Sequence, residues 1–111
     1  MPQPARLRLA GTVLALAVSV AAGPALSAPA DAAAGRVLAE RWCAACHVVA
    51  PGQPGAVSDA PTFAAIAARD GDVSGAWLSF RLLKPHPQMP QVTLSREEAA
   101  DLAAYFASLK R

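Results

Sequence analysis

The feature that most limits how this chain can fold is a pair of cysteines followed directly by a histidine: residues 43–47 read C-A-A-C-H. The C-x-x-C-H spacing is typical of covalent attachment of a c-type haem. Cysteines three positions apart at a helix end lie on the same side, so each thiol can add to one vinyl group of the porphyrin. His47 is then carried under the iron as an axial ligand. The motif therefore predicts one haem c, bound through Cys43 and Cys46.

Three other interpretations of the two cysteines are open, and we favour haem over each of them. A thioredoxin-like redox pair sits in a βαβ context, which this sequence does not indicate. A zinc site with His47 and His86 would use every cysteine and histidine of the chain, and the adjacency of Cys46 and His47 does not match finger spacing. A plain disulfide is the third interpretation.

Length and composition exclude several classes of protein. A chain of 111 residues is too short for a doubly wound α/β enzyme or a TIM barrel. Much of its 54% hydrophobic fraction is alanine, which favours helices. A formal net charge of +2 is too small to indicate nucleic-acid binding. We therefore expect an all-α protein that does not bind nucleic acid.

The first thirty residues have the pattern of a secretory signal peptide. Two arginines precede an apolar run over 9–22, and Gly23-Pro24 ends this run. Ala28 and Ala30 fit the A-x-A cleavage rule, so we expect cleavage after Ala30. An uncleaved membrane anchor is the alternative, but spanning requires about 20 apolar residues. Because haem attachment takes place outside the cytoplasm, the signal and the motif agree, and both indicate export to the periplasm.

Cleavage would leave one domain over residues 31–111, with eight basic and eight acidic side chains and no stable membrane insertion. The core of so small a domain is marginal without a metal, disulfide or other cross-link, and a covalently held haem would supply one.

Helices are expected over 32–42 after the N-cap Asp31, over 62–69, from 72 or 74 to 83 or 84, and after Ser95, where Glu98 completes a capping box. The last helix carries an apolar stripe of Leu102, Tyr105, Phe106 and Leu109, with Lys110 and Arg111 at its end. Residues 48–61 are expected to form a loop.

Met89 is the predicted sixth ligand of the iron. It lies 42 residues beyond His47 in the sequence P-H-P-Q-M-P at 85–90, where prolines limit the conformations of the segment. Methionine and histidine together raise the reduction potential of a haem. The other interpretation of Met89 is a core methionine that fills a gap. His86 is read as a surface or propionate-facing imidazole, and bis-histidine ligation through His86 is the alternative.

These features together resemble the small class I cytochromes c of bacteria. The resemblance covers residues 31–111. It depends on Gly35, eight residues before Cys43, on C-A-A-C-H, on H-P-Q-M-P, and on the ending D-L-A-A-Y-F-A-S-L at 101–109. It implies a cytochrome c fold of three to five helices wrapped around one haem, with Gly35 packed against Leu102 and Tyr105. An aromatic often stands four residues after this glycine, where the chain has Ala39, and we expect Trp42 to supply part of that packing.

The resemblance also implies residues that support the haem. The carbonyl of Pro61, in the sequence A-P-T-F, is expected to accept a hydrogen bond from Nδ1 of His47 and so fix the tautomer of the imidazole. Trp77 either donates its indole proton to a haem propionate or packs in the core beside Phe80 and Leu82. Arg81 and Lys84 either balance propionate charge or are solvated surface charges.

The predicted function is that of a monomeric periplasmic one-electron carrier that exchanges electrons with redox partner proteins. With both axial positions filled, we expect no enzymatic activity. One alternative is a haem-bearing electron-entry subunit of a dehydrogenase or oxidase complex. The other is an enzyme or gas sensor with an open iron, which requires Met89 to be absent from the iron or easily displaced.

Overall fold

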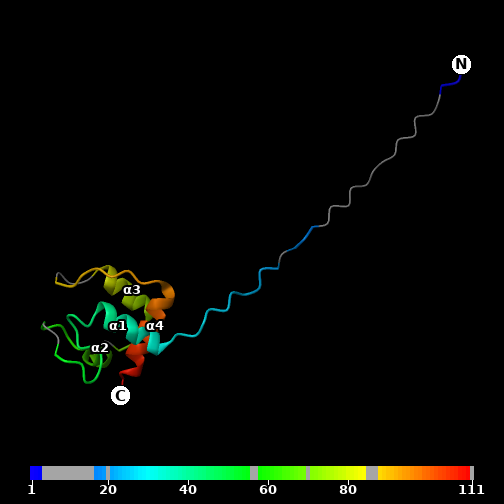
Figure 1. Cartoon of the computed structure of the whole chain (residues 1–111). Helices are drawn as coiled ribbons and strands as arrows, with labels where there is room; N and C mark the ends of the chain where they lie inside the picture. Colours follow the sequence, from blue (N-terminus) through cyan, green and yellow to red (C-terminus); the bar gives the residue numbers. More distant parts are fainter. Residues whose placement is uncertain (4–16, 20, 56–57, 70, 85–87, 111) are drawn as a thin grey trace.

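The computed structural model describes residues 1–3, 17–19, 21–55, 58–69, 71–84 and 88–110, and within these residues it contains four helices and no strand. The helices are α1 (Ala32–Trp42), α2 (Phe63–Arg69), α3 (Gly75–Leu83) and α4 (Arg96–Ser108) (Figure 1). The predicted all-α fold class is confirmed. The expected bounds of α1 are also confirmed, and Asp31 caps it by accepting from the N–H groups of Ala33 and Ala34.

The helical body begins with the N-cap Asp31, directly after the predicted signal peptide. Residues 21–30 are exposed and lead away from the body without forming a helix (Figure 1). Most of the predicted signal sequence, 4–16 and residue 20, lies outside the described residues, so cleavage after Ala30 stays a prediction. No helix among the described residues is long and apolar enough to span a membrane.

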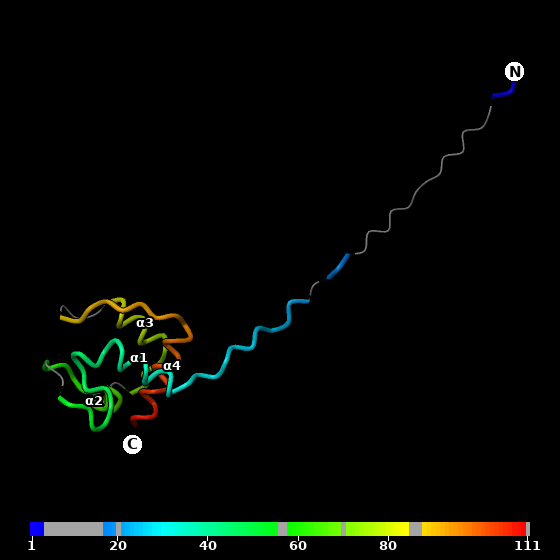
Figure 2. The backbone as a smooth tube through the Cα atoms, in the orientation of Figure 1, coloured from blue at the N-terminus to red at the C-terminus, as the bar shows by residue number. Residues whose placement is uncertain are grey.

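Helices α1 and α4, from opposite ends of the domain, cross in close contact (Figure 2). A Cβ atom placed on Gly35 would lie 2.5 Å from the carbonyl carbon of Asp101 and 2.9 Å from the backbone nitrogen of Leu102. Only a residue without a side chain fits there, which confirms the predicted packing of Gly35 against Leu102. The backbone N–H of Asp31 also donates to Oδ1 of Asp101 at 2.7 Å. The two ends of the domain are thus joined at one place.

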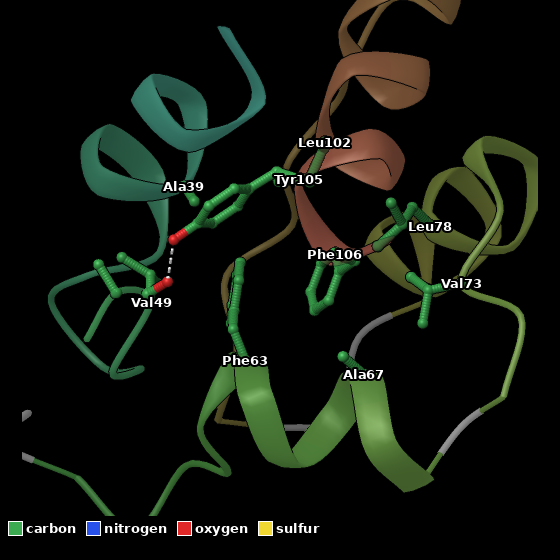
Figure 3. Packing of buried hydrophobic residues seen from close by; sticks show 10 residues of the cluster. Ala39, Val49, Phe63, Ala67, Val73, Leu78, Leu102, Tyr105 and Phe106 are labelled. Atoms are coloured by element: carbon green, nitrogen blue, oxygen red, sulfur yellow. Dashed lines mark hydrogen bonds between the residues drawn. The ribbon is translucent and has the colours of Figure 1, made fainter. Parts of the chain in front are cut away.

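The core lies between this helix pair, α2 and α3. Phe63 of α2 and Phe106 of α4 stack with their ring centroids 4.4 Å apart (Figure 3). Tyr105 donates from its hydroxyl to the carbonyl oxygen of Val49 at 2.5 Å, as the dashed line in Figure 3 marks. The buried cluster is completed by small and aliphatic side chains: Ala39, Ala50, Ala67, Val73, Leu78 and Leu102.

The expectation that Trp42 supplies core packing is wrong. Trp42 is 52% exposed, with the guanidinium of Arg41 lying 5.0 Å from its ring centroid. Ala39 is fully buried. Ala39 lies one turn after Gly35 on α1. Because α1 and α4 approach so closely at Gly35, the space between them at Ala39 is filled by a methyl group, and an aromatic ring is not required there.

Side-chain caps set where the remaining helices begin. Thr62 accepts from the N–H of Ala65 through its hydroxyl, and α2 therefore starts at Phe63, one residue later than expected. Ser74 accepts from the N–H of Trp77, and α3 begins at Gly75. The predicted capping box of Ser95 and Glu98 is confirmed at the start of α4.

Lys110 lies beyond α4, and its ammonium donates to the carbonyl of Gly71. Arg111, expected beside it, is outside the described residues.

Candidate haem site

The C-A-A-C-H motif forms a tight turn at the end of α1. Cys43 is the C-cap of α1 and donates its N–H to the carbonyl of Ala39. The carbonyl of Cys43 then accepts from the N–H groups of Cys46, at 3.1 Å, and of His47, at 2.9 Å. These two bonds hold residues 43–47 in a compact turn, so that both thiols and the imidazole extend from one short segment.

The two thiols differ in their surroundings. The two cysteines are not joined in a disulfide; Cys43 is partly buried and Cys46 is exposed. Burial raises the pKa of the Cys43 thiol to about 11, because the apolar surroundings disfavour the charged thiolate. Ser58 donates from its hydroxyl to the carbonyl of Cys46 at 2.7 Å, which holds the outer end of the motif. The role of Ser58 was not predicted, because a serine in a loop carries no local signal of its partner.

His47 is buried, with 6% of its surface exposed, and its ring is held on two sides. Its Nδ1 lies 2.6 Å from the carbonyl oxygen of Pro61, which is the contact expected from the sequence. Its ring also lies 5.5 Å, between centroids, from that of Phe63. Because a carbonyl only accepts, Nδ1 carries the proton, and Nε2 keeps its lone pair for a metal ion.

A glutamine beside the motif was also missed. Gln53 accepts from the N–H of Val49 through Oε1 at 2.9 Å, and its Nε2 donates to the carbonyl oxygens of His47 at 3.0 Å and Ala44 at 3.3 Å. Pattern reading places Gln53 in a proline- and glycine-rich loop and gives it no role. The amide group of Gln53 therefore cross-links the backbone of residues 44–49, the segment that carries His47.

Two adjoining cavities, of about 220 and 510 Å³, meet at the motif, and the same four residues line both of them: Cys43, His47, Pro61 and Met89. The smaller cavity has an apolar wall made by Phe63, Ile66, Leu78, Leu82, Leu102 and Phe106. The larger one is also lined by Cys46 and Trp42. The histidine and the methionine therefore contribute to the same space although 42 positions of sequence separate them.

The segment after α3 brings Met89 to these cavities. Met89 is partly buried between exposed Gln88 and Pro90. His86, the alternative ligand, lies outside the described residues. Gln91 donates from its side chain to the carbonyl of Leu83 at 3.3 Å, which ties the segment back to the end of α3.

Trp77, Arg81 and Lys84 all line the smaller cavity from α3 and its end. Trp77 is partly buried and packs against the core, and the guanidinium of Arg81 lies 5.3 Å from its ring centroid. Lys84 is exposed, with its ammonium 5.8 Å from the ring centroid of Phe80. The side of the cavity formed by α3 thus combines an indole N–H donor with two cations, groups that suit the carboxylates of a haem propionate.

The residues present fit a covalently bound haem. A large apolar macrocycle requires an apolar wall, and the smaller cavity provides aromatic and aliphatic side chains. Cys43 and Cys46 both line the larger cavity, so both thiols reach the same space. An imidazole nitrogen and a thioether sulfur are ligands that haem iron accepts.

The chain is similar to a known cytochrome along almost its whole length. Cytochrome c-552 from Bradyrhizobium diazoefficiens is 53% identical over 104 residues, which are 94% of this chain and 97% of that protein. No protein-family model matches the chain, and no solved structure matches it.

Proposed function

Because the chain belongs to the small class I c-type cytochromes and carries one haem c through Cys43 and Cys46, we propose that it is an exported one-electron carrier whose iron is ligated by His47 and Met89. Membership of this family makes it an electron carrier with redox partner proteins. The export, the ligand pair and the action as a free monomeric carrier are the proposal.

The observation that carries the proposal is that His47 and Met89 line the same two cavities. His47 is buried, and the Pro61 carbonyl fixes its tautomer so that Nε2 faces away from the protein contact. Met89 enters from the segment after α3. The haem, when bound, supplies a one-electron change at iron. With an imidazole and a thioether as ligands, that change requires no bond to the iron to form or break.

The remaining groups of the site bind and shield the haem. Phe63, Leu102 and Phe106 are almost completely buried and exclude water from the smaller cavity. Trp77 would hold a haem propionate through its indole N–H, and Arg81 and Lys84, which line the same cavity, would supply positive charge. Electrons would pass to the partner protein at the edge of the bound haem.

The absorption spectrum of the purified protein tests the ligand pair. The oxidised protein should show the weak sulfur-to-iron band in the near-red region, and Met89→Ala should abolish it. Gln88→Ala, a change at the exposed neighbour, and His86→Ala should both leave the band in place. A wild-type protein without this band, or loss of the band only in His86→Ala, would reject Met89 as the ligand.

Two further measurements separate the proposal from its alternatives. Slow binding of carbon monoxide to the reduced protein is expected, since Met89 must first leave the iron; fast and tight binding would instead indicate an open-iron sensor or enzyme. N-terminal sequencing of periplasmic material should give a chain that begins at Asp31. Recovery of the full-length chain in the membrane would contradict export as a cleaved protein.

A further inference from the structure

Gln53 stands at the end of a tight turn that returns the chain to the haem-binding motif. The backbone N–H of Gln53 donates to the carbonyl of Ala50 at 3.3 Å, which closes a four-residue turn. Pro51 and Gly52 occupy its two central positions, and Gly52 has a φ of +77°. A proline followed by a residue with positive φ is the type II pattern, and glycine adopts that conformation without strain. The turn therefore directs the Gln53 side chain back over residues 44–49.

The amide of Gln53 joins three separate peptide groups of that segment. Its oxygen accepts from the N–H of Val49, and its nitrogen donates to the carbonyls of His47 and Ala44, at distances of 2.9 to 3.3 Å. These are one acceptor and both donors of a single planar group, so its orientation is fixed by its partners. Among the described residues, Gln53 is the side chain that hydrogen-bonds to the carbonyl of His47.

We propose that Gln53 is a positioning residue for the axial histidine, which holds the His47 backbone so that the imidazole keeps its hydrogen bond to the Pro61 carbonyl. The proposal rests on the proposed ligation of the iron by His47. The imidazole has two anchors, its own backbone and the Pro61 carbonyl at 2.6 Å. The backbone anchor has two bonds: the N–H of His47 donates to the carbonyl of Cys43 at 2.9 Å, and the carbonyl of His47 accepts from Gln53. Loss of the bond from Gln53 weakens this anchor, and the bond to Pro61 then opens more often.

Tyr105 offers a comparison within the same segment. Its hydroxyl donates to the carbonyl of Val49, while Gln53 accepts from the N–H of Val49. Tyr105 is buried, and the structure gives its hydroxyl no bond to His47 or Ala44 among the described residues. Removal of this hydroxyl therefore weakens the same loop without releasing the carbonyl of the histidine.

The experiment measures the exchange of the His47 Nδ1 proton with solvent, by NMR on the reduced holoprotein, together with the midpoint potential. Gln53→Leu should speed this exchange about tenfold, the factor for one lost hydrogen bond. It should also raise the midpoint potential, because a weaker bond at Nδ1 makes the imidazole less basic and stabilises the oxidised iron less. Both ligands and the haem should remain in place.

Two variants separate positioning from general stability. Gln53→Glu keeps the acceptor for the Val49 N–H and loses both donations, so it should speed exchange as Gln53→Leu does; it also serves where Gln53→Leu yields no holoprotein. Tyr105→Phe should lower stability and leave the exchange rate within twofold of wild type. Unchanged exchange in both Gln53 variants, or equal acceleration in Tyr105→Phe, would overturn the proposal. A wild-type protein whose spectrum lacks histidine ligation would instead reject the proposed function.

Discussion

The side of the site that carries His47 is constructed differently from the side that carries Met89. The histidine side comprises α1, residues 43–63 and the face of α4 that they contact; here Pro61, Gln53 and Tyr105 bind the segment by hydrogen bonds of 2.5 to 3.3 Å. The methionine side comprises α3 and residues 88–94, where Met89 stands between two exposed residues. The histidine is thus fixed by several protein contacts, whereas the methionine, the proposed second ligand, lies in a segment tied to α3 by the bond from Gln91 to Leu83.

The same contrast appears where each side packs on α4. A Cβ atom at Gly35 of α1 would approach the α4 backbone to 2.9 Å or less, whereas one at Gly75 of α3 would lie 3.3 Å from it. The contact on the histidine side leaves no space for adjustment, and the contact on the methionine side leaves a little. We therefore expect changes on the histidine side to be costly and matched changes on the methionine side to be mild.

The largest expected effect is the loss of a buried ring. Phe106→Ala removes a side chain that is 2% exposed and stacked on Phe63, and it should lower the free energy of unfolding by about 3–5 kcal/mol. Phe80→Ala, on α3, removes a ring that is 59% exposed and should change it by less than about 0.5 kcal/mol. Denaturant unfolding of the two holoproteins measures the difference. Equal losses would show that the exposed face of α3 is as important to stability as the core.

The next effect concerns the two glycines that face α4. Gly35→Ala forces α1 away from the backbone of Asp101 and should destabilise the protein by about 3 kcal/mol. Gly75→Ala requires a shift of a few tenths of an ångström and gains helix propensity, so its effect should stay within about 1 kcal/mol of wild type. Thermal unfolding of both variants is the measurement. A Gly35→Ala protein as stable as wild type would contradict the close crossing of α1 and α4.

A smaller effect is expected at the helix caps. Ser95→Ala removes the hydroxyl that accepts from the N–H of Glu98 and weakens the reciprocal bond from the backbone N–H of residue 95 to the Glu98 carboxylate, so it should cost about 1–2 kcal/mol. Ser74→Ala removes the single cap bond to the Trp77 N–H of α3 and should cost about 0.5–1 kcal/mol. Denaturant midpoints of the two variants can be compared directly. If Ser74→Ala proves the more harmful, the methionine side depends on local structure more than we infer.

The smallest effect is expected at an ion pair on the outer face of α1. Arg36 and Glu40 lie 2.7 Å apart, with side chains that are 54% and 46% exposed. The neighbouring carboxylate raises the pKa of Arg36, but solvent screens an exposed pair of this kind. Glu40→Gln should leave the melting temperature unchanged within the precision of the measurement. A clear drop would mean that even the outer surface of the histidine side contributes to its stability.

Local signals were enough to predict the helices. The bounds of α1 follow from the N-cap Asp31 and the alanine-rich run after it, and the start of α4 follows from Ser95 and Glu98. These features act within four residues, so the sequence contains both the group and its partner. The contact of Nδ1 of His47 with the Pro61 carbonyl was expected from family resemblance, because no local rule joins positions 47 and 61.

Contacts between positions far apart in the sequence were harder to predict. Tyr105 could be placed on the apolar stripe of α4, but its bond to the Val49 carbonyl depends on where a loop 56 residues earlier passes. The hydrogen bonds of Gln53 could not be predicted either, because its partners are three backbone groups of a kind that every residue has. Trp42 was expected to replace the aromatic that the family often has four residues after the glycine, and it is half exposed because the close helix crossing fills that space with Ala39.

The crossing of α1 and α4 also has a consequence for the order in which the protein folds. Asp31 and Asp101, which meet at 2.7 Å, are separated by 70 positions, and Val49 and Tyr105 by 56. Closing loops of this length is entropically costly and slow compared with the formation of a single helix. Individual helices can therefore form before these long-range contacts, but the core is not complete until α4 packs against α1. A haem fixed at Cys43 and Cys46 gives the intervening helices an apolar surface to gather on before the two ends of the domain meet.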